Sequence, residues 1–168
     1  MSIGYGWDEG QYVADERVFV GLGSNLAERE ENLRAALNGI SSLAGTRVAQ
    51  VSAFRETPPW GVEDQPAFLN AVAEIRTALE PEALLEAVKR LEGELGRVPS
   101  FRWGPRLIDI DLLLYGERRL QTDRLTLPHP RILERPFVWE PLAEIAPEVV
   151  EELRRAVVPL RSTGPDGE

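Results

Sequence analysis

The chain contains no cysteine and only one histidine among its 168 residues. Disulfide bonds are therefore excluded, and a zinc site made from protein ligands alone would lack the thiolates and imidazoles that it needs. Any metal site in this protein has to use oxygen ligands. Long apolar runs are also missing, because no stretch approaches the roughly 18 residues that a membrane-spanning helix requires.

Positive charge is scarce as well. The formal net charge is −9, and Lys89 is the only lysine in the sequence. Affinity for nucleic acids and anionic membranes depends largely on accumulated positive charge, so the composition disfavours broad binding to either. The first residues lack the basic and apolar regions of a signal peptide, and the sequence therefore predicts a cytoplasmic protein.

A chain of this length predicts one domain with one sizeable core. The hydrophobic fraction of 43% and the charged fraction of 28% are typical of a soluble globular protein. Residues 1–16 are rich in glycine and acidic side chains and show no periodicity, so they are expected to form an extension. Residues 161–168 have the same character, which leaves a single domain at 17–160.

Strand and helix patterns alternate along this domain. Apolar residues predict strands at 17–24, 46–56, 66–79 and 107–116, followed by short, proline-broken helices around 136–147. One helix is expected between the first two strands and ends before Gly45, and a second begins at Pro81 and ends at Gly96. The order β-α-β-β-α-β predicts an α+β, ferredoxin-like fold in which helices cover one face of an antiparallel sheet.

Side chains alternate between the two faces of a strand, so the pattern also predicts which residues share a face. One face of the fourth strand is expected to carry Ile108, Ile110, Leu112 and Leu114. The apolar face of the third strand is expected to carry Leu69, Ala71, Ala73 and Ile75. If these sets pack against the helices, the uncovered face holds a candidate site formed by Phe68, Asn70, Asp109 and Asp111.

Asp109 and Asp111 are the first candidate functional pair. Like charges near 4 Å apart repel by about 4 kcal/mol at an effective dielectric constant of about 20, so the pair requires a cation or an arginine. Ligation by one or two carboxylates together with substrate phosphates is typical of Mg2+. The alternative is that both carboxylates only form ion pairs with Arg102 and Arg106 on a solvated strand face.

The predicted loop at 97–106 contains Arg97, Arg102 and Arg106 in a protein that is otherwise strongly acidic. Guanidinium groups make two parallel hydrogen bonds to phosphate oxygens. Carboxylates for Mg2+ and arginines for phosphate together indicate phosphoryl transfer. Arginines that serve only the solubility of the surface are the alternative.

Other motifs are ambiguous on their own. The turn GLGSN at 21–25 completes neither a Walker nor a Rossmann pattern, so we expect a tight turn that caps a helix, although its amides are able to bind a polar group. His129 lies between prolines without a GxSxG motif, which favours a structural role. Glu92 is either a ligand contact or part of a solvated helix flank. Aromatic residues in or beside loops, which either stack on a flat ring or pack under the loops, are Trp60, Trp103, Phe137 and Trp139.

Four segments, in their order and spacing, resemble one known family. They are GLGSN, ETPPWGVEDQPAFLNAV, RWGPRLIDIDLLLYG and LTLPHPRILERPFVWEPL, and they are similar to the 6-hydroxymethyl-7,8-dihydropterin pyrophosphokinases of folate biosynthesis. The resemblance covers about residues 17–150. It implies a monomeric, ferredoxin-like enzyme that transfers the terminal diphosphate of ATP to the hydroxymethyl oxygen of the pterin and releases AMP.

The resemblance also implies roles for individual residues. Asp109 and Asp111 would hold two Mg2+ ions, and they form the implied catalytic set with Arg102 and Arg106. The implied pterin contacts are Thr57, Pro58, Pro59, Trp60, Gly61, Phe68, Asn70 and Phe137. The implied nucleotide contacts are Glu92, Arg97, Arg102, Trp103, Arg106, Leu112, Arg124, Thr126, His129 and Arg135. The two loops rich in proline and glycine would close as lids over the substrates.

The chain departs from the family pattern at several positions. Phe68 replaces a frequent tyrosine, Pro99 replaces an arginine that reaches ATP in some members, and Pro130 replaces a tyrosine found in some relatives. Lys89 stands where a glutamine contacts the nucleotide, and the arginine-bearing loop is one residue short. These differences concern loop closure and the contacts to ATP.

Two other functions fit parts of the pattern. A nucleotidyltransferase also combines a Gly-Ser turn with a DxD strand, but its turn lies shortly before the aspartates, whereas more than 80 residues separate them here. A ligand-sensing module without catalysis is the second alternative, because a fold alone does not determine function. That alternative leaves the DxD pair on the uncovered face without an explanation.

Overall fold

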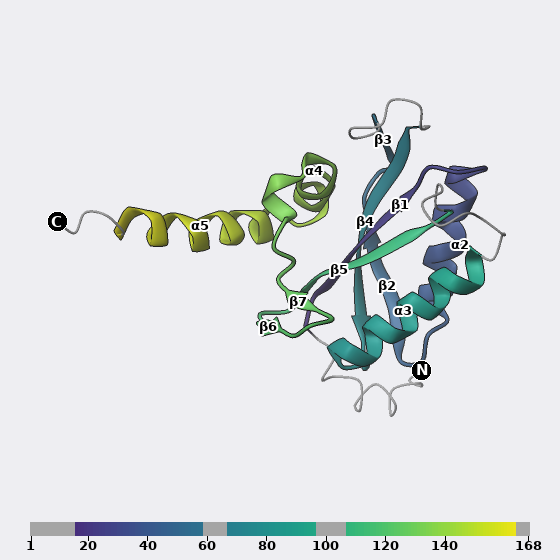
Figure 1. Ribbon diagram of the computed structural model, residues 1–168, viewed down its shortest axis with the longest axis horizontal. Coiled ribbons are helices and arrows are strands. Elements are labelled where there is room, and N and C mark those ends of the chain that lie inside the picture. The colour runs from purple at the N-terminus through teal and green to yellow at the C-terminus, as the bar shows by residue number, and fades with distance from the viewer. Residues whose placement is uncertain (1–15, 59–66, 97–106, 164–168) are drawn as a thin grey trace, which may run out of the picture.

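The computed structural model describes residues 16–58, 67–96 and 107–163, and Figure 1 shows their arrangement. The central sheet contains β1 (Val18–Ser24), β2 (Thr46–Val51), β4 (Phe68–Thr77) and β5 (Asp109–Tyr115) in the order β2-β4-β1-β5. All of these neighbours pair antiparallel. The short strand β3 (Arg55–Thr57) pairs with β4 as well. This order confirms the predicted ferredoxin-like fold.

Two helices cover one face of the sheet, as the sequence predicted. They are α2 (Arg29–Ser41) and α3 (Pro81–Leu95), which lie side by side in Figure 1. Pro81 occupies the first helical turn of α3, where its missing N–H costs no hydrogen bond, and Gly96 follows the last residue. Between these helices and the sheet lies the first hydrophobic cluster, whose fully buried members include Leu33, Ile40, Ile75, Leu84 and Ile110.

The predicted strand at 46–56 is in fact two strands. The ladder is interrupted at Ser52, whose hydroxyl accepts a hydrogen bond from the Val72 N–H at 3.0 Å. The Ser52 N–H in turn donates to the Val72 carbonyl at 2.9 Å. The serine side chain therefore replaces a backbone partner of β4, and β3 begins three residues later. Apolar alternation carries no signal for such a replacement.

The prediction for Leu114 was wrong. Phe19 pairs with Leu114 and Val20 pairs with Leu112, so Leu113 is the extra residue of a β-bulge. Leu113 lies on the face that carries Asp109 and Asp111, as alternation predicts, and the bulge turns Leu114 to that face as well, so both join a second hydrophobic cluster. Tyr115 returns to the first cluster together with Ile108, Ile110 and Leu112.

The chain after β5 covers part of the opposite face. It forms β6 (Leu120–Gln121), β7 (Thr126–Leu127), the 3-10 helix η2 (Ile132–Glu134), α4 (Pro136–Ile145) and α5 (Pro147–Thr163). Val138 and Leu142 of α4 pack with Phe19 and Val72 of the sheet in the second cluster. The face that we expected to be uncovered is therefore open over only part of its area.

Helix α5 continues three residues into the segment predicted as a tail, and in Figure 1 it extends away from the sheet toward the C-terminus. Across the described ranges, none of the helices combines the length and the apolar character needed to cross a bilayer.

Candidate active site

The part of the sheet face that α4 leaves open forms a cavity of about 490 Å³. Its floor comes from β1, β4 and β5, and its far wall comes from the segment of η2 and α4. The residues that line it are Gly21, Leu22, Gly23, Thr57, Phe68, Asn70, Ala71, Val72, Asp109, Asp111, Arg131, Glu134, Arg135, Phe137 and Val138. The four residues that the strand pattern assigned to a common face are all among them.

The glycines of β1 make room for the polar side chains on either side. In the sheet register, Gly23 lies between Asn70 of β4 and Asp109 of β5, and Gly21 lies opposite Asp111. A Cβ atom at position 23 would come within 2.9 Å of Asn70 Oδ1, which is closer than real Cβ contacts. At Gly21 and Gly23 of the GLGSN segment, the floor of the cavity is therefore backbone that carries no side chain.

Asn70 is held in a defined orientation. Its side chain is 7% exposed, and Nδ2 donates a hydrogen bond to Thr57 Oγ1 at 2.7 Å. A side-chain amide offers both donors and an acceptor, so Asn70 is able to read the hydrogen-bonding edge of a flat heterocycle. Phe68 and Phe137 line the same cavity, and the Arg135 guanidinium lies 5.9 Å from the centroid of the Phe137 ring.

Asp109 and Asp111 point to the same face of β5 and line the same cavity. Asp109 is half-buried and Asp111 is exposed. Among the described residues, no group of three or more acidic, histidine or cysteine side chains is placed to hold a metal ion. The pair fits a hard cation that takes its remaining ligands from phosphate oxygens and water, which is how Mg2+ is usually bound.

Ile110, which separates the two aspartates, is fixed from the side of α3. Its N–H donates to Glu92 Oε2 at 2.5 Å, and its carbonyl accepts from Lys89 Nζ at 3.1 Å. Lys89 and Glu92 also form an ion pair at 3.1 Å. Burial raises the pKa of the Glu92 carboxyl, and the Ile110 N–H and the Lys89 charge act in the opposite direction. Both backbone polar groups of Ile110 are therefore held by side chains.

A second cavity of about 380 Å³ lies on the other side of Asp111. Its lining residues are Leu85, Lys89, Ile110, Asp111, Leu112, Thr122, Asp123, Arg124, Leu125, Thr126, His129 and Pro130. Four of the predicted nucleotide contacts, Leu112, Arg124, Thr126 and His129, come together here. Because Asp111 lines both cavities, a ligand in one would approach a ligand in the other at this carboxylate.

The surroundings of His129 favour its neutral form and one tautomer. Burial lowers the pKa of its imidazole, and this effect exceeds the opposing attraction of Asp111. Nδ1 accepts a hydrogen bond from the Arg131 N–H at 3.1 Å, so the ring proton of the neutral form lies on Nε2. The His129 N–H donates to the Leu113 carbonyl at 2.8 Å, which fixes this segment to β5.

Some predicted site residues lie elsewhere. Pro59, Trp60, Gly61, Arg97, Arg102, Trp103 and Arg106 are outside the described residues. Pro58 and Glu92 line neither cavity, and Arg135, predicted to contact the nucleotide, lines the cavity with Phe68 and Phe137. The sequence interpretation missed Gly21, Gly23, Arg131, Glu134 and Val138 as lining residues. The sequence did contain a signal for the two glycines: they are two positions apart in a predicted strand, so they lie on the same face of it.

Comparison with known proteins identifies the family of the chain. A family model described as 7,8-dihydro-6-hydroxymethylpterin-pyrophosphokinase matches residues 19–147. A 2-amino-4-hydroxy-6-hydroxymethyldihydropteridine pyrophosphokinase of Bacillus subtilis is 46% identical over 138 residues, which cover 82% of this chain and 83% of that protein. A protein of the same name from Pseudomonas aeruginosa is 47% identical over 134 residues, covering 80% of this chain and 83% of that protein.

A plant relative carries a different name. The folate synthesis bifunctional protein of Pisum sativum is 44% identical over 131 residues, which cover 78% of this chain and 25% of that longer protein. The extent of the family match and these identities show that the chain belongs to the 7,8-dihydro-6-hydroxymethylpterin-pyrophosphokinase family.

Proposed function

We propose that the protein transfers the terminal diphosphate of ATP to the hydroxymethyl oxygen of 6-hydroxymethyl-7,8-dihydropterin and releases AMP, as a step of folate synthesis. The observation that supports this reaction best is the position of Asp111, which lines two adjacent cavities. A reaction between two small molecules requires two sites that meet at the reacting atoms. One cavity is lined by two aromatic rings and a side-chain amide, and the other gathers cationic side chains, hydroxyls and an imidazole.

The pterin is proposed to occupy the cavity between Phe68 and Phe137. Aromatic rings on both sides would stack on the heterocycle, and Asn70, oriented by Thr57, would read its donor and acceptor edge. The nucleotide is proposed to occupy the second cavity, against Leu112, Arg124, Thr126 and His129. The neutral imidazole of His129 offers a donor at Nε2 without adding a charge to the site.

Asp109 and Asp111 are proposed to hold two Mg2+ ions. When bound, Mg2+ would neutralise charge on the triphosphate and on the departing AMP. The hydroxymethyl oxygen forms a bond to the β-phosphorus, the bond between that phosphorus and the oxygen linking it to the α-phosphorus breaks, and its electron pair leaves with AMP. The hydroxyl proton passes to solvent. Arg102 and Arg106 belong to the proposed catalytic set, and Arg97, Trp103, Glu92 and Arg135 to the proposed nucleotide contacts.

One experiment separates this reaction from the alternatives. The protein is incubated with Mg-ATP and 6-hydroxymethyl-7,8-dihydropterin, and the nucleotide and pterin products are resolved by chromatography. We expect AMP and a diphosphorylated pterin in equal amounts, and no turnover when a chelator removes the divalent cation. Free diphosphate would indicate nucleotidyl transfer, ADP would indicate transfer of a single phosphoryl group, and binding without turnover would indicate a sensing module. The proposal also includes a cytoplasmic location and a monomeric state.

A further inference from the structure

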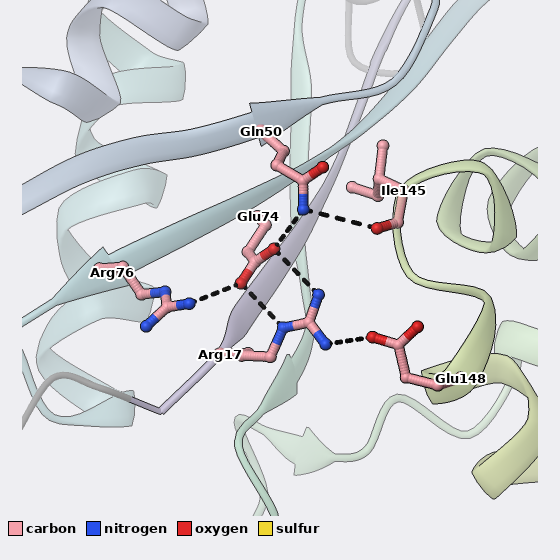
Figure 2. Close-up of polar contacts among 6 residues, drawn as sticks. All are labelled: Arg17, Gln50, Glu74, Arg76, Ile145 and Glu148. Carbon is pink, nitrogen blue, oxygen red and sulfur yellow. Dashed lines mark hydrogen bonds and ion pairs between the residues drawn. The ribbon is translucent and has the colours of Figure 1, made fainter.

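A buried carboxylate lies on the cavity side of the sheet but outside the cavity. Glu74 of β4 is 2% exposed and follows Asn70 and Val72 on the same face of the strand. Burial alone would raise the pKa of its carboxyl, but hydrogen bonds from Arg17 and Gln50 hold that pKa below its usual range. An ionised carboxylate at this depth requires such donors, and Glu74 is the centre of the network that they form (Figure 2).

The network joins three strands. Glu74 accepts from Arg17 Nε at 2.9 Å, from Gln50 Nε2 at 2.8 Å and from Arg76 Nη2 at 3.2 Å. Arg17 directly precedes β1, Gln50 lies on β2, and Arg76 lies on β4. One carboxylate thus fixes the side chains of two neighbouring strands on the face that α4 covers.

The same donors continue to the helices, as Figure 2 shows. Arg17 Nη1 donates to the carboxylate of Glu148 in the first turn of α5. Gln50 Nε2 also lies 3.5 Å from the carbonyl oxygen of Ile145, the last residue of α4. Because Glu74 holds Arg17 and Gln50 from the sheet, both side chains are oriented toward the junction between α4 and α5.

This junction lies at one end of α4, and the other end carries Phe137 and Val138, which line the cavity. Val138 and Leu142 pack α4 against the sheet on both sides of Pro141, and close packing transmits a displacement of one end of the helix to the other. We propose that Glu74 is a positioning residue: it anchors the α4–α5 junction through Arg17 and Gln50, and so sets the distance between Phe137 and the floor of the cavity, which carries Phe68. The expected consequence for the pterin depends on the proposed function of the cavity.

The test uses Glu74→Gln, which keeps the shape of the side chain and removes its charge. The matched control is Glu30→Gln, because Glu30 also accepts from an arginine, Arg34, but is exposed on α2. Arg17→Met is the second variant, and it answers the same question if Glu74→Gln fails to fold. For each protein we would measure hydrogen exchange of α4 amides in the free state, with α3 amides as the internal reference.

The same proteins would then be titrated with 6-hydroxymethyl-7,8-dihydropterin, in the presence of Mg2+ and α,β-methylene-ATP, and separately with ATP. We expect Glu74→Gln to accelerate exchange in α4 and to weaken pterin binding by about tenfold, with exchange in α3 and the Kd of ATP changed by less than about twofold. Glu30→Gln should match the wild type in all four measurements.

Unchanged exchange in α4 would overturn the proposal, and so would equal weakening of pterin and ATP, because a general loss of stability affects both. A wild-type protein that binds no pterin would instead contradict the proposed function. In that case the exchange data alone would still decide whether Glu74 positions α4.

Discussion

Glu92 Oε2 lies 2.5 Å from the backbone nitrogen of Ile110, and this contact takes the place of a hydrogen bond to a neighbouring strand. Within the described residues β5 is at the edge of the sheet, so none of the described strands lies beside the outward N–H and carbonyl of Ile110. Glu92 takes the position of an acceptor and Lys89 that of a donor, both from one face of α3. Since Ile110 separates Asp109 from Asp111, the ion pair on α3 also restrains the spacing of the two carboxylates.

The first prediction concerns Lys89→Met, which keeps the apolar stem and removes the donor. The Ile110 carbonyl would lose its partner, and Glu92 would lose the cation beside it. We expect the Mg2+ concentration for half-maximal turnover to rise by about three- to tenfold, because the aspartates would be less well ordered. Turnover as a function of Mg2+ at saturating substrates measures this. Arg34→Met, which removes an exposed arginine on α2, is the control, and equal Mg2+ dependence in all three proteins would contradict the prediction.

The second prediction concerns the carboxylates themselves. Asp109→Asn and Asp111→Asn each remove one charge and one ligand from the proposed Mg2+ site, so we expect kcat/KM to fall by at least about two orders of magnitude. The melting temperature of Asp111→Asn should stay the same or rise, because the repulsion between the two side chains is relieved. Glu31→Gln, on an exposed position of α2, controls for the loss of one negative charge. Normal rates in both aspartate variants would contradict the proposal that Asp109 and Asp111 bind Mg2+.

The strands and their faces were predictable because the alternation of apolar side chains is a local pattern. Asn70 and Asp111 are more than 40 positions apart in the sequence, yet the period of two placed them on one face. The bulge at Leu113 was not predictable, because an extra residue in β5 is only visible against its partner β1. The break at Ser52 depends in the same way on a hydroxyl that meets Val72 across the sheet.

The sequence also failed to predict how much of the site face is covered. The sequence predicts that Val138 and Leu142 belong to a short helix, but the neighbouring residues in the sequence do not indicate that they pack on Phe19 and Val72. Alternation along β4 places Glu74 on the same face as Asn70, but its partner Arg17 is 57 positions away in the sequence. Long-range contacts of this kind follow from the tertiary packing and have no periodic signature.

The third prediction contrasts two glycines in helices. A Cβ atom at Gly39 of α2 would lie 2.6 Å from Leu91 Cδ1 of α3, whereas a Cβ atom at Gly93 would meet no atom of the described residues within 4 Å. Gly39→Ala is therefore expected to lower the free energy of unfolding, because overpacking costs about 1–3 kcal/mol and the better helix propensity of alanine returns only about 0.5–1 kcal/mol. Gly93→Ala should raise it by about 0.5–1 kcal/mol, because alanine favours the helix. Urea denaturation measures the free energy of unfolding of both variants. A change of the same sign in the two would contradict the close approach of α2 and α3.

The last prediction follows from the lowered pKa of Glu74. A carboxyl whose pKa is lower in the folded protein than in the unfolded chain stabilises the fold above the unfolded pKa, which is 4.5 for an ordinary glutamate. As the pH falls below that value, the unfolded chain binds the proton first, and the stabilisation is lost until the folded protein is protonated as well. We therefore expect the wild-type free energy of unfolding to decrease more steeply below this pH than that of Glu74→Gln.

Urea denaturation at a series of pH values from neutral to acid measures both slopes. Arg17→Met keeps the carboxyl but removes the donor that contributes most to lowering its pKa, so its slope should also be shallower than that of the wild type. Both variants lose the ion pair between Glu74 and Arg17, so the difference in stability that this pair causes should shrink as the carboxyl becomes protonated. Wild-type and Glu74→Gln curves that run parallel through the acid range would show that the Glu74 carboxylate gains nothing from Arg17 in the folded protein.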